Sequence, residues 1–169
     1  MGFARPVQLK REHDVEGFAC GEQALNDWLL KHALDSHASG GARVYVALAD
    51  DGRVAGYYAV TAAQVEPSEA VPRAMKGQPG HRPVPAILLA RLAVDLAFQG
   101  QGLGVGLLND ALLRSLTVAE EIGIRVVLVH AQNDRAKTFY EQYGFEESPT
   151  DRKHLMVLVK DVRRTLDAA

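Results

Sequence analysis

The sequence predicts an α/β fold of the α+β kind, in which flanking helices cover a mixed central sheet. Three observations predict it. An amphipathic helix pattern comes first, a β-hairpin follows it, and the second half of the chain alternates buried strands with helices. With 169 residues the chain has room for one sizeable core, so we expect a single domain over residues 1–169.

The first third of the chain predicts a helix and a hairpin. Apolar residues recur at three- and four-residue spacing over 22–37, which marks one buried face of a helix, and Ser39-Gly40-Gly41 ends it. Two strand-like runs, 43–48 and 54–65, flank the turn sequence Asp50-Asp51-Gly52-Arg53. This turn chemistry between two apolar runs predicts an antiparallel hairpin.

A proline-rich segment interrupts the pattern between Glu66 and Pro85, where five of the seven prolines fall. It predicts a long irregular loop. Loops of that length inside a compact domain are uncommon and tend to be lids or binding segments, although a plain surface excursion is the ordinary alternative.

The second half of the chain predicts strands and helices in alternation. Residues 86–94 are apolar apart from Arg91, as expected of a central strand that is covered on both faces. A glycine-rich stretch, 98–106, then opens a helix that runs to Ile122. The remaining elements are a strand at 125–129, a short helix at 134–143 with Gly144 at its C-terminus, and a strand at 155–159.

Composition and charge narrow the class of protein. Apolar residues make up 47% of the chain and charged residues 24%, which is ordinary for a globular protein that works in water. A net charge of −2 excludes a bulk nucleic-acid binder and leaves room for a local basic patch. Cys20 is the single cysteine, so neither an internal disulfide nor a cysteine metal site is expected. We expect a cytoplasmic protein without a leader, a membrane span or a metal.

The glycine-rich stretch carries the chemistry, and its spacing decides among three phosphate-binding loops. A P-loop needs Lys and Ser/Thr after its last glycine, where this chain has Val105 and Gly106. A dinucleotide fingerprint needs glycines at relative positions 1, 3 and 6, whereas here they fall at every second position from Gly100. Residues 99–104 instead match the Gln/Arg-x-x-Gly-x-Gly/Ala signature with which GNAT acetyltransferases hold the pyrophosphate of CoA.

The resemblance extends over almost the whole chain. The stretches that carry it include Cys20-Gly21-Glu22-Gln23-Ala24-Leu25-Asn26-Asp27-Trp28-Leu29, Arg91-Leu92-Ala93-Val94-Asp95 and Phe139-Tyr140-Glu141-Gln142-Tyr143-Gly144-Phe145. The chain resembles the tRNA-acetylating toxins of bacterial toxin–antitoxin systems. That resemblance implies the GNAT fold, with splayed central strands, and acetyl-CoA as cosubstrate without a metal.

The resemblance also implies which residues bind the cosubstrate and which one is catalytic. Tyr140 is implied as the general acid that protonates the departing thiolate, and Asn133 as a further cofactor contact. The implied cofactor-binding residues are Leu92, Ala93, Val94, Gln99, Gly100, Gln101, Gly102, Leu103, Gly104, Val105 and Asn133. The acid role is chemically sound, because proton transfer from a phenol of pKa about 10 to a thiolate of about 8.5 costs roughly 2 kcal/mol. Without the motif, packing would be the ordinary role for an aromatic residue on a short helix.

The acceptor amine determines whether a general base is needed. A lysine must lose a proton held with a pKa of about 10.4, whereas an α-amine titrates near roughly 8, so an α-amine scarcely needs a dedicated base. Aminoacyl-tRNA therefore suits the chain. No base is assigned among the candidates Glu66, His81, His130 and His154. Basic residues that could form a phosphate-contacting rim for the RNA are Arg73, Lys76, Arg82, Arg135, Lys137, Arg152 and Lys153, although scattered basic residues are ordinarily solvated surface. Arg91 is different, because a charge within a buried strand needs a partner or a cavity, and we expect it to face the active-site cleft.

The leading hypothesis is acetyl transfer to the α-amine of aminoacyl-tRNA, which blocks translation. By resemblance, a ribbon-helix-helix antitoxin neutralises the enzyme and the enzyme is a homodimer. One alternative keeps the chemistry and makes the acceptor a protein N-terminus, a lysine or a small amine. A third hypothesis, a catalytically silent CoA-binding module, is disfavoured by the intact glycine loop and Tyr140.

Overall fold

The computed structural model describes residues 3–167, and the chain in it forms two compact units. The first unit is built from the chain up to Thr61 together with Ala90–Ala111, and the second from Ala62–Leu89 together with the chain from Leu112 onward. Each unit therefore consists of two separate stretches of sequence.

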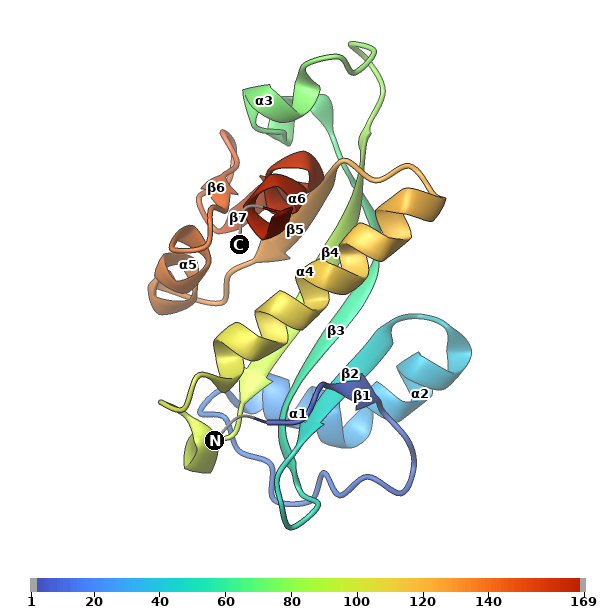
Figure 1. Ribbon diagram of the computed structural model, residues 1–169. Helices are drawn as coiled ribbons and strands as arrows, with labels where there is room; N and C mark the ends of the chain where they lie inside the picture. The colour runs from blue at the N-terminus through green and yellow to red at the C-terminus, as the bar shows by residue number, and fades with distance from the viewer. Residues whose placement is uncertain (1–2, 168–169) are drawn as a thin grey trace. The chain divides into compact units, whose positions relative to one another are not determined.

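The first unit packs two helices against strands (Figure 1). Its elements are β1 (Val7–Gln8), α1 (Gln23–Lys31), α2 (Ala33–Ser39), β2 (Arg43–Leu48), the first part of β3 (Val54–Val65), the end of β4 (Val84–Val94), a 3-10 turn (Leu96–Phe98) and the start of α4 (Leu103–Glu121). Leu25 and Leu29 of α1 join Ala33 of α2 in one buried cluster. The same cluster contains Val44 of β2 and Tyr57 of β3, so the predicted apolar helix face does cover the hairpin.

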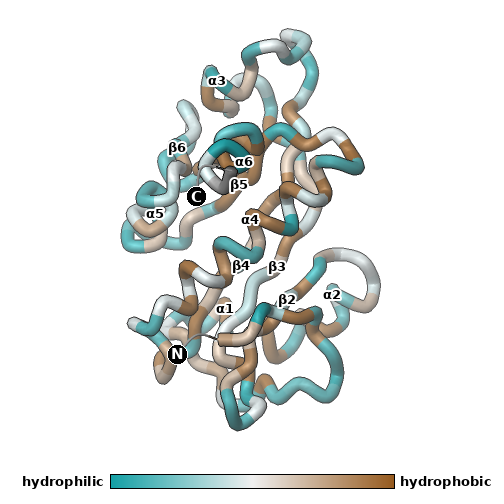
Figure 2. The backbone as a smooth tube through the Cα atoms, in the orientation of Figure 1, coloured by the Kyte–Doolittle hydropathy of each residue, from teal (hydrophilic) through white to brown (hydrophobic). Residues whose placement is uncertain are grey.

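The second unit carries the remaining elements. They are a 3-10 turn (Pro67–Glu69), α3 (Pro72–Met75), the start of β4, the end of α4, β5 (Val126–His130), α5 (Asp134–Glu141), β6 (Glu146–Glu147), β7 (His154–Leu158) and α6 (Val159–Asp167). Its core gathers buried side chains such as Val71, Val84 and Met156. The tube along β5 is coloured hydrophobic in Figure 2, in keeping with the burial of its first four residues.

The sheet is mixed, as the sequence predicts. Over the described residues the strands hydrogen-bond in the order β1-β2-β3-β4-β5-β7-β6. The predicted hairpin of β2 and β3 is antiparallel, with Arg43 opposite Val60. β4 and β5 run parallel from Ala86↔Val126 to Leu89↔Val129, and β7 runs antiparallel to β5.

Two predicted elements differ from the structure in kind. The helix expected over 22–37 is two helices, because the backbone at His32 (φ −126°, ψ −24°) leaves the helical region between α1 and α2. Gly40 ends α2 in the left-handed conformation (φ 86°), as the Ser39-Gly40-Gly41 signal predicts. The segment 66–85 is irregular only in part, because prolines at the first position start two short helical turns in its first half and β4 begins at Val84.

The other differences lie at element ends and in short elements. β4 begins at Val84 rather than 86, α4 at Leu103, and β5 and β7 each lie one residue off the predicted bounds. The sequence analysis missed β1, β6 and the C-terminal helix α6, which begins directly where β7 ends. No helix within residues 3–167 is long and apolar enough to cross a membrane.

Candidate functional site

The predicted site residues fall into two groups, one in each unit. The first unit holds Arg91, Leu92–Val94 and the glycine loop, and the second holds Asn133, Tyr140 and the exposed basic candidates.

The glycine loop, residues 99–105, has the backbone geometry that a phosphate cradle requires. Gly100 and Gly102 have φ of +79° and +83°, which L side chains rarely adopt, and a Cβ at either position would meet nothing within 4 Å. The amide of Gly106 donates to the carbonyl of Gly102 at 3.0 Å, so the amides before it belong to the first turn of α4. First-turn amides have no partner inside their own helix and face the positive end of its dipole, which suits a pyrophosphate. The residues present therefore fit CoA.

Gln99, the first residue of the signature, closes the base of this loop. Its side-chain amide donates to the carbonyl oxygens of Val94 at 3.0 Å and Cys20 at 3.2 Å. The side chain thus joins the end of β4 to the segment before α1. These contacts shape the loop, and a contact between Gln99 and the cofactor stays a prediction.

Asp95 is a functional candidate that the sequence analysis quoted and left without a role. Its buried carboxylate accepts hydrogen bonds from the amides of Ala97 at 2.9 Å and Ala19 at 3.1 Å. Its own amide donates to the carbonyl of Ala55 at 2.8 Å. One carboxylate therefore fixes the approach to the glycine loop, and an aspartate two residues before the amide it caps is the signal that could have found it.

The end of β4 supplies the backbone predicted to bind the pantetheine arm. Ala93 is buried, while Leu92 and Val94 are half-buried. Gly56 of β3 lies so close that a Cβ there would meet the Ala93 carbonyl oxygen at 3.0 Å and Leu107 Cδ1 at 2.9 Å. In the glycine loop Gln101 is exposed and Leu103 is buried, so Leu103 anchors the start of α4 in the core.

Arg91 lies on an aromatic stack. Its guanidinium carbon is 4.3 Å from the centroid of the Trp28 ring. Trp28 in turn stacks on Tyr57, with ring centroids 6.0 Å apart and an interplanar angle of 13°. The prediction that this arginine is more than a surface charge agrees with its half-buried position.

Tyr140 combines a buried ring with an accessible hydroxyl. The ring is 7% exposed and contacts Phe139 and Phe145 at centroid distances of 5.2 and 5.4 Å. Among the described residues its hydroxyl has no hydrogen-bond partner, and no buried side-chain nitrogen or oxygen lacks one, so the hydroxyl oxygen reaches solvent. Burial raises the pKa of Tyr140 above its ordinary value, which keeps the phenol protonated. This is the state that a general acid needs.

The helix that carries Tyr140 is fixed at two points. Asn133 caps α5, since its side-chain oxygen accepts from the amide of Ala136 at 2.9 Å. Lys137, one turn before Tyr140, is buried and pairs with Glu147 of β6. The hydrogen bond from the Lys137 ammonium holds the pKa of Glu147 below its usual range. Lys137 is therefore part of the structure of this helix and not of an exposed basic rim.

Two histidines, both considered as bases, form a pair at the end of β5. The rings of His130 and His154 stack with centroids 3.9 Å apart, and His154 Nε2 is 3.4 Å from Asp151. Burial, followed by the facing His154, lowers the pKa of His130, while Asp151 opposes the shift.

The exposed basic candidates differ in how they are paired. Arg73 pairs with Asp161 at 2.8 Å and with Glu146 at 3.6 Å, so its charge is largely neutralised. Lys76, Arg82 and Arg135 are exposed, and no carboxylate within residues 3–167 pairs with them. They remain the better candidates for contacting an anion.

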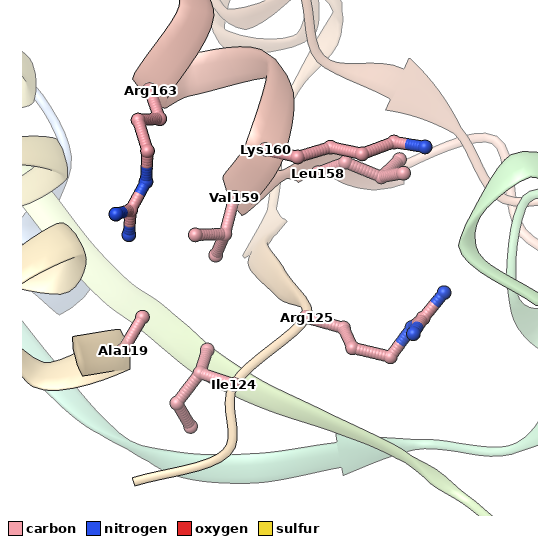
Figure 3. Close-up of a pocket in the computed structure, with 7 residues that line it drawn as sticks. All are labelled: Ala119, Ile124, Arg125, Leu158, Val159, Lys160 and Arg163. Carbon is pink, nitrogen blue, oxygen red and sulfur yellow. The ribbon is translucent and has the colours of Figure 1, made fainter. Parts of the chain in front are cut away.

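The second unit also has a pocket of about 300 Å³, whose lining side chains are drawn in Figure 3. None of its lining residues was predicted as a site residue. Its lining consists of Ala119, Ile124, Arg125, Leu158, Val159, Lys160 and Arg163. Arg125 donates to the carbonyl oxygens of Ala74 at 3.0 Å and Lys76 at 2.6 Å, and Arg163 lies 3.6 Å from Glu120. Two of its three cations therefore already have partners.

Comparisons with known proteins agree with this geometry. The acetyltransferase (GNAT) domain family matches residues 40–147. A tRNA-acetylating toxin of Mycobacterium tuberculosis is 46% identical over 162 residues, which cover 96% of this chain and 96% of that protein.

Two solved structures of the toxin AtaT are also similar. AtaT complexed with acetyl-methionyl-tRNAfMet is 26% identical with a TM-score of 0.87, covering 95% of this chain and 98% of that one. A Tyr-to-Phe mutant of AtaT bound to the C-terminus of the antitoxin AtaR and acetyl-CoA is 26% identical with a TM-score of 0.81, covering 95% and 96%. Family match, relatives and geometry together show that the chain is an N-acetyltransferase of the GNAT family, in the branch that contains the tRNA-acetylating toxins.

Proposed function

We propose that this protein is a toxin that transfers the acetyl group of acetyl-CoA to the α-amine of an aminoacyl-tRNA and so blocks translation. The observation that carries the proposal is Tyr140, whose ring is buried and whose protonated hydroxyl is accessible. Similarity to a tRNA-acetylating toxin over 96% of both chains supports tRNA as the acceptor.

The chain's residues have distinct tasks in this reaction. The amides of Gly100–Val105 bind the pyrophosphate of acetyl-CoA, and the backbone of Leu92–Val94 binds its pantetheine arm. The neutral α-amine attacks the thioester carbonyl, the C–S bond breaks, and Tyr140 gives its proton to the sulfur. The amine's surplus proton returns to the Tyr140 phenolate through water, so the enzyme ends as it began. Burial around Tyr140 disfavours the thiolate and the phenolate alike, so the return of the proton through water is what leaves both groups neutral.

The partners, the compartment and the domain organisation are part of the same proposal. A cognate antitoxin of the ribbon-helix-helix type binds and neutralises the enzyme, which acts as a homodimer in the cytoplasm and forms one domain. The structure of AtaT bound to the C-terminus of the antitoxin AtaR supports an antitoxin as a partner. Lys76, Arg82 and Arg135, with Asn133 at the head of α5, are the residues of the second unit that we assign to substrate and cofactor contacts.

The test is acetyl transfer with labelled acetyl-CoA to bulk aminoacylated tRNA, with uncharged tRNA and a lysine-rich protein as alternative acceptors. We expect label on charged tRNA alone. Tyr140→Phe should lower kcat by roughly 10²- to 10⁴-fold, the contribution of a general acid, and leave acetyl-CoA binding unchanged.

Tyr143→Phe is the matched control, because Tyr143 is 38% exposed and follows the same helix. It should retain activity. Label on protein, or full activity of Tyr140→Phe, would refute the proposal.

A further inference from the structure

Arg91 is a cation within the described residues that no carboxylate neutralises. It stands in the middle of β4, between Ala90 and Leu92, and is half-buried. Within residues 3–167 no ion pair or hydrogen bond engages its guanidinium, and every buried side-chain nitrogen has a partner, so its N–H groups face solvent. A half-buried charge normally has a counter-ion, and the donors of Arg91 are open to one from outside the chain.

The aromatic stack holds this guanidinium in place. Trp28 lies 4.3 Å from it and stacks in turn on Tyr57. Tyr57 is fully buried, donates its hydroxyl to the carbonyl of Leu25 at 2.8 Å and meets the edge of Phe18. The stack therefore rests on the core of the first unit. An arginine whose flat face lies on an aromatic ring presents its N–H edge, and that edge matches two oxygens of a phosphate.

Arg91 and the glycine loop, which we expect to hold the CoA phosphates, lie toward opposite faces of the sheet. Tyr57 points to the α1 side, where it joins the cluster with Leu25 and Ala93. Its neighbour Gly56 points to the other side, where a Cβ would meet Leu103 and Leu107 of α4. Arg91 shares the face of Trp28 and α1, whereas the glycine loop leads into α4 on the opposite face. The position of Arg91 therefore favours a contact with the acceptor substrate over a contact with acetyl-CoA.

We propose that Arg91, supported by Trp28 and Tyr57, binds a phosphate of the tRNA acceptor strand next to the aminoacylated 3′ end. The proposal rests on the proposed function and adds a residue that recognises the nucleic acid itself. The Arg91 contact makes the enzyme prefer an amino acid that is attached to RNA over the same amino acid on a nucleoside.

The kinetic test compares Arg91→Gln and Arg91→Lys with the wild type on two acceptors, aminoacyl-tRNA and phosphate-free 3′-O-aminoacyl-adenosine. We expect Arg91→Gln to lower kcat/KM for aminoacyl-tRNA by roughly 10- to 100-fold, the effect of losing a charge-assisted hydrogen bond. Arg91→Lys should recover part of it. The KM for acetyl-CoA and the activity on aminoacyl-adenosine should not change, and the slope of log KM against log salt should fall by about 0.7.

The binding test uses Trp28, the single tryptophan of the chain, as a reporter that does not depend on activity. Uncharged tRNA should change its fluorescence to saturation, and Arg91→Gln should weaken this binding by the same factor, with an unchanged circular dichroism spectrum. CoA titrated in a separate arm should bind both proteins equally.

Three outcomes would overturn the proposal. A raised KM for acetyl-CoA with normal tRNA kinetics would assign the arginine to a CoA phosphate. Equal losses on both acceptors would make it a structural residue. If the wild type acetylates no aminoacyl-tRNA, the proposed function fails, and unaltered tRNA binding by Arg91→Gln would then refute the present proposal as well.

Discussion

Asp95 shows how one buried side chain can hold the approach to the glycine loop in place. Its two carboxylate oxygens accept from amides on separate segments, Ala19 before α1 and Ala97 before the glycine loop. Gln99 adds a second link between the same segments through the carbonyl of Cys20. The loop predicted to bind the pyrophosphate is therefore tied to the N-terminal segment at two points.

Asp95→Asn should weaken both the fold and acetyl-CoA binding. An amide keeps one acceptor oxygen and sets an NH₂ group against the other backbone donor, so we expect a loss of about 1–3 kcal/mol in the free energy of unfolding. The KM for acetyl-CoA should rise, because the loop loses one of its two links. Urea denaturation and steady-state kinetics measure the two effects. Asp50→Asn, an exposed turn residue, is the charge-matched control, and equal effects of the two changes would contradict this role.

For single residues, the sequence predicts a role where the residue belongs to a recognisable motif. It does not predict a role that depends on packing against a distant residue. The φ of Gly100 and Gly102 agrees with the spacing argument, since only glycine adopts it easily. The burial of Lys137 could not be foreseen, because its partner Glu147 lies on a two-residue strand with no strand signal of its own. A lysine on an exposed-looking helix ordinarily stays in solvent.

Among the elements, α4 packs tightly against β3, and Gly56 makes this close packing possible. Its missing Cβ leaves space for Leu103 and Leu107, which anchor the turn of α4 that follows the glycine loop. Gly56, which lies far from α4 in sequence, therefore determines how closely α4 packs against β3. The first turn of the same helix presents the amides that follow the glycine loop.

Gly56→Ala should destabilise the protein, and Gly106→Ala should stabilise it. The first adds a methyl group at 2.9 Å from Leu107 and 3.0 Å from a backbone oxygen, and such overpacking costs roughly 1–3 kcal/mol. The second adds a methyl group that meets nothing within 4 Å on α4, and alanine is favoured over glycine in a helix by about 0.8–1 kcal/mol. Thermal unfolding of both variants checks the pair. A tolerated Gly56→Ala would mean that α4 can shift away from β3.

Helices and strands were predicted correctly where the apolar pattern extends over many residues. They were predicted wrongly where only the local backbone conformation determines the end of an element. The hairpin and α4 follow from apolar patterns and turn residues. The break at His32 has neither glycine nor proline to mark it. In 66–85, the prolines that seemed to exclude regular structure instead begin two helical turns.

At the scale of the whole molecule, the stability of the fold depends on pH through the histidine pair. Burial and the facing His154 lower the pKa of His130, so the folded protein resists a proton that the unfolded chain accepts below about pH 6.5. The free energy of unfolding should therefore fall as the pH drops below that value. Above it the ring is neutral in both states and adds no pH dependence.

His130→Gln should flatten this dependence. The midpoint of urea denaturation, compared between pH 7.5 and pH 5.5, should fall less in the variant than in the wild type. An identical fall in both proteins would show that another group, such as His37, whose pKa burial also lowers, carries the acid sensitivity.

The division of each unit into two separate stretches of sequence sets the order in which a growing polypeptide can become an enzyme. The glycine loop leaves the ribosome only after Ala62–Leu89, which belongs to the other unit, has been made. β7, which pairs with β5 along its whole length, follows all the other strands in the chain order of the described residues. The sheet, and with it the acetyltransferase fold, is therefore complete only after β7 has been synthesised and has paired with β5.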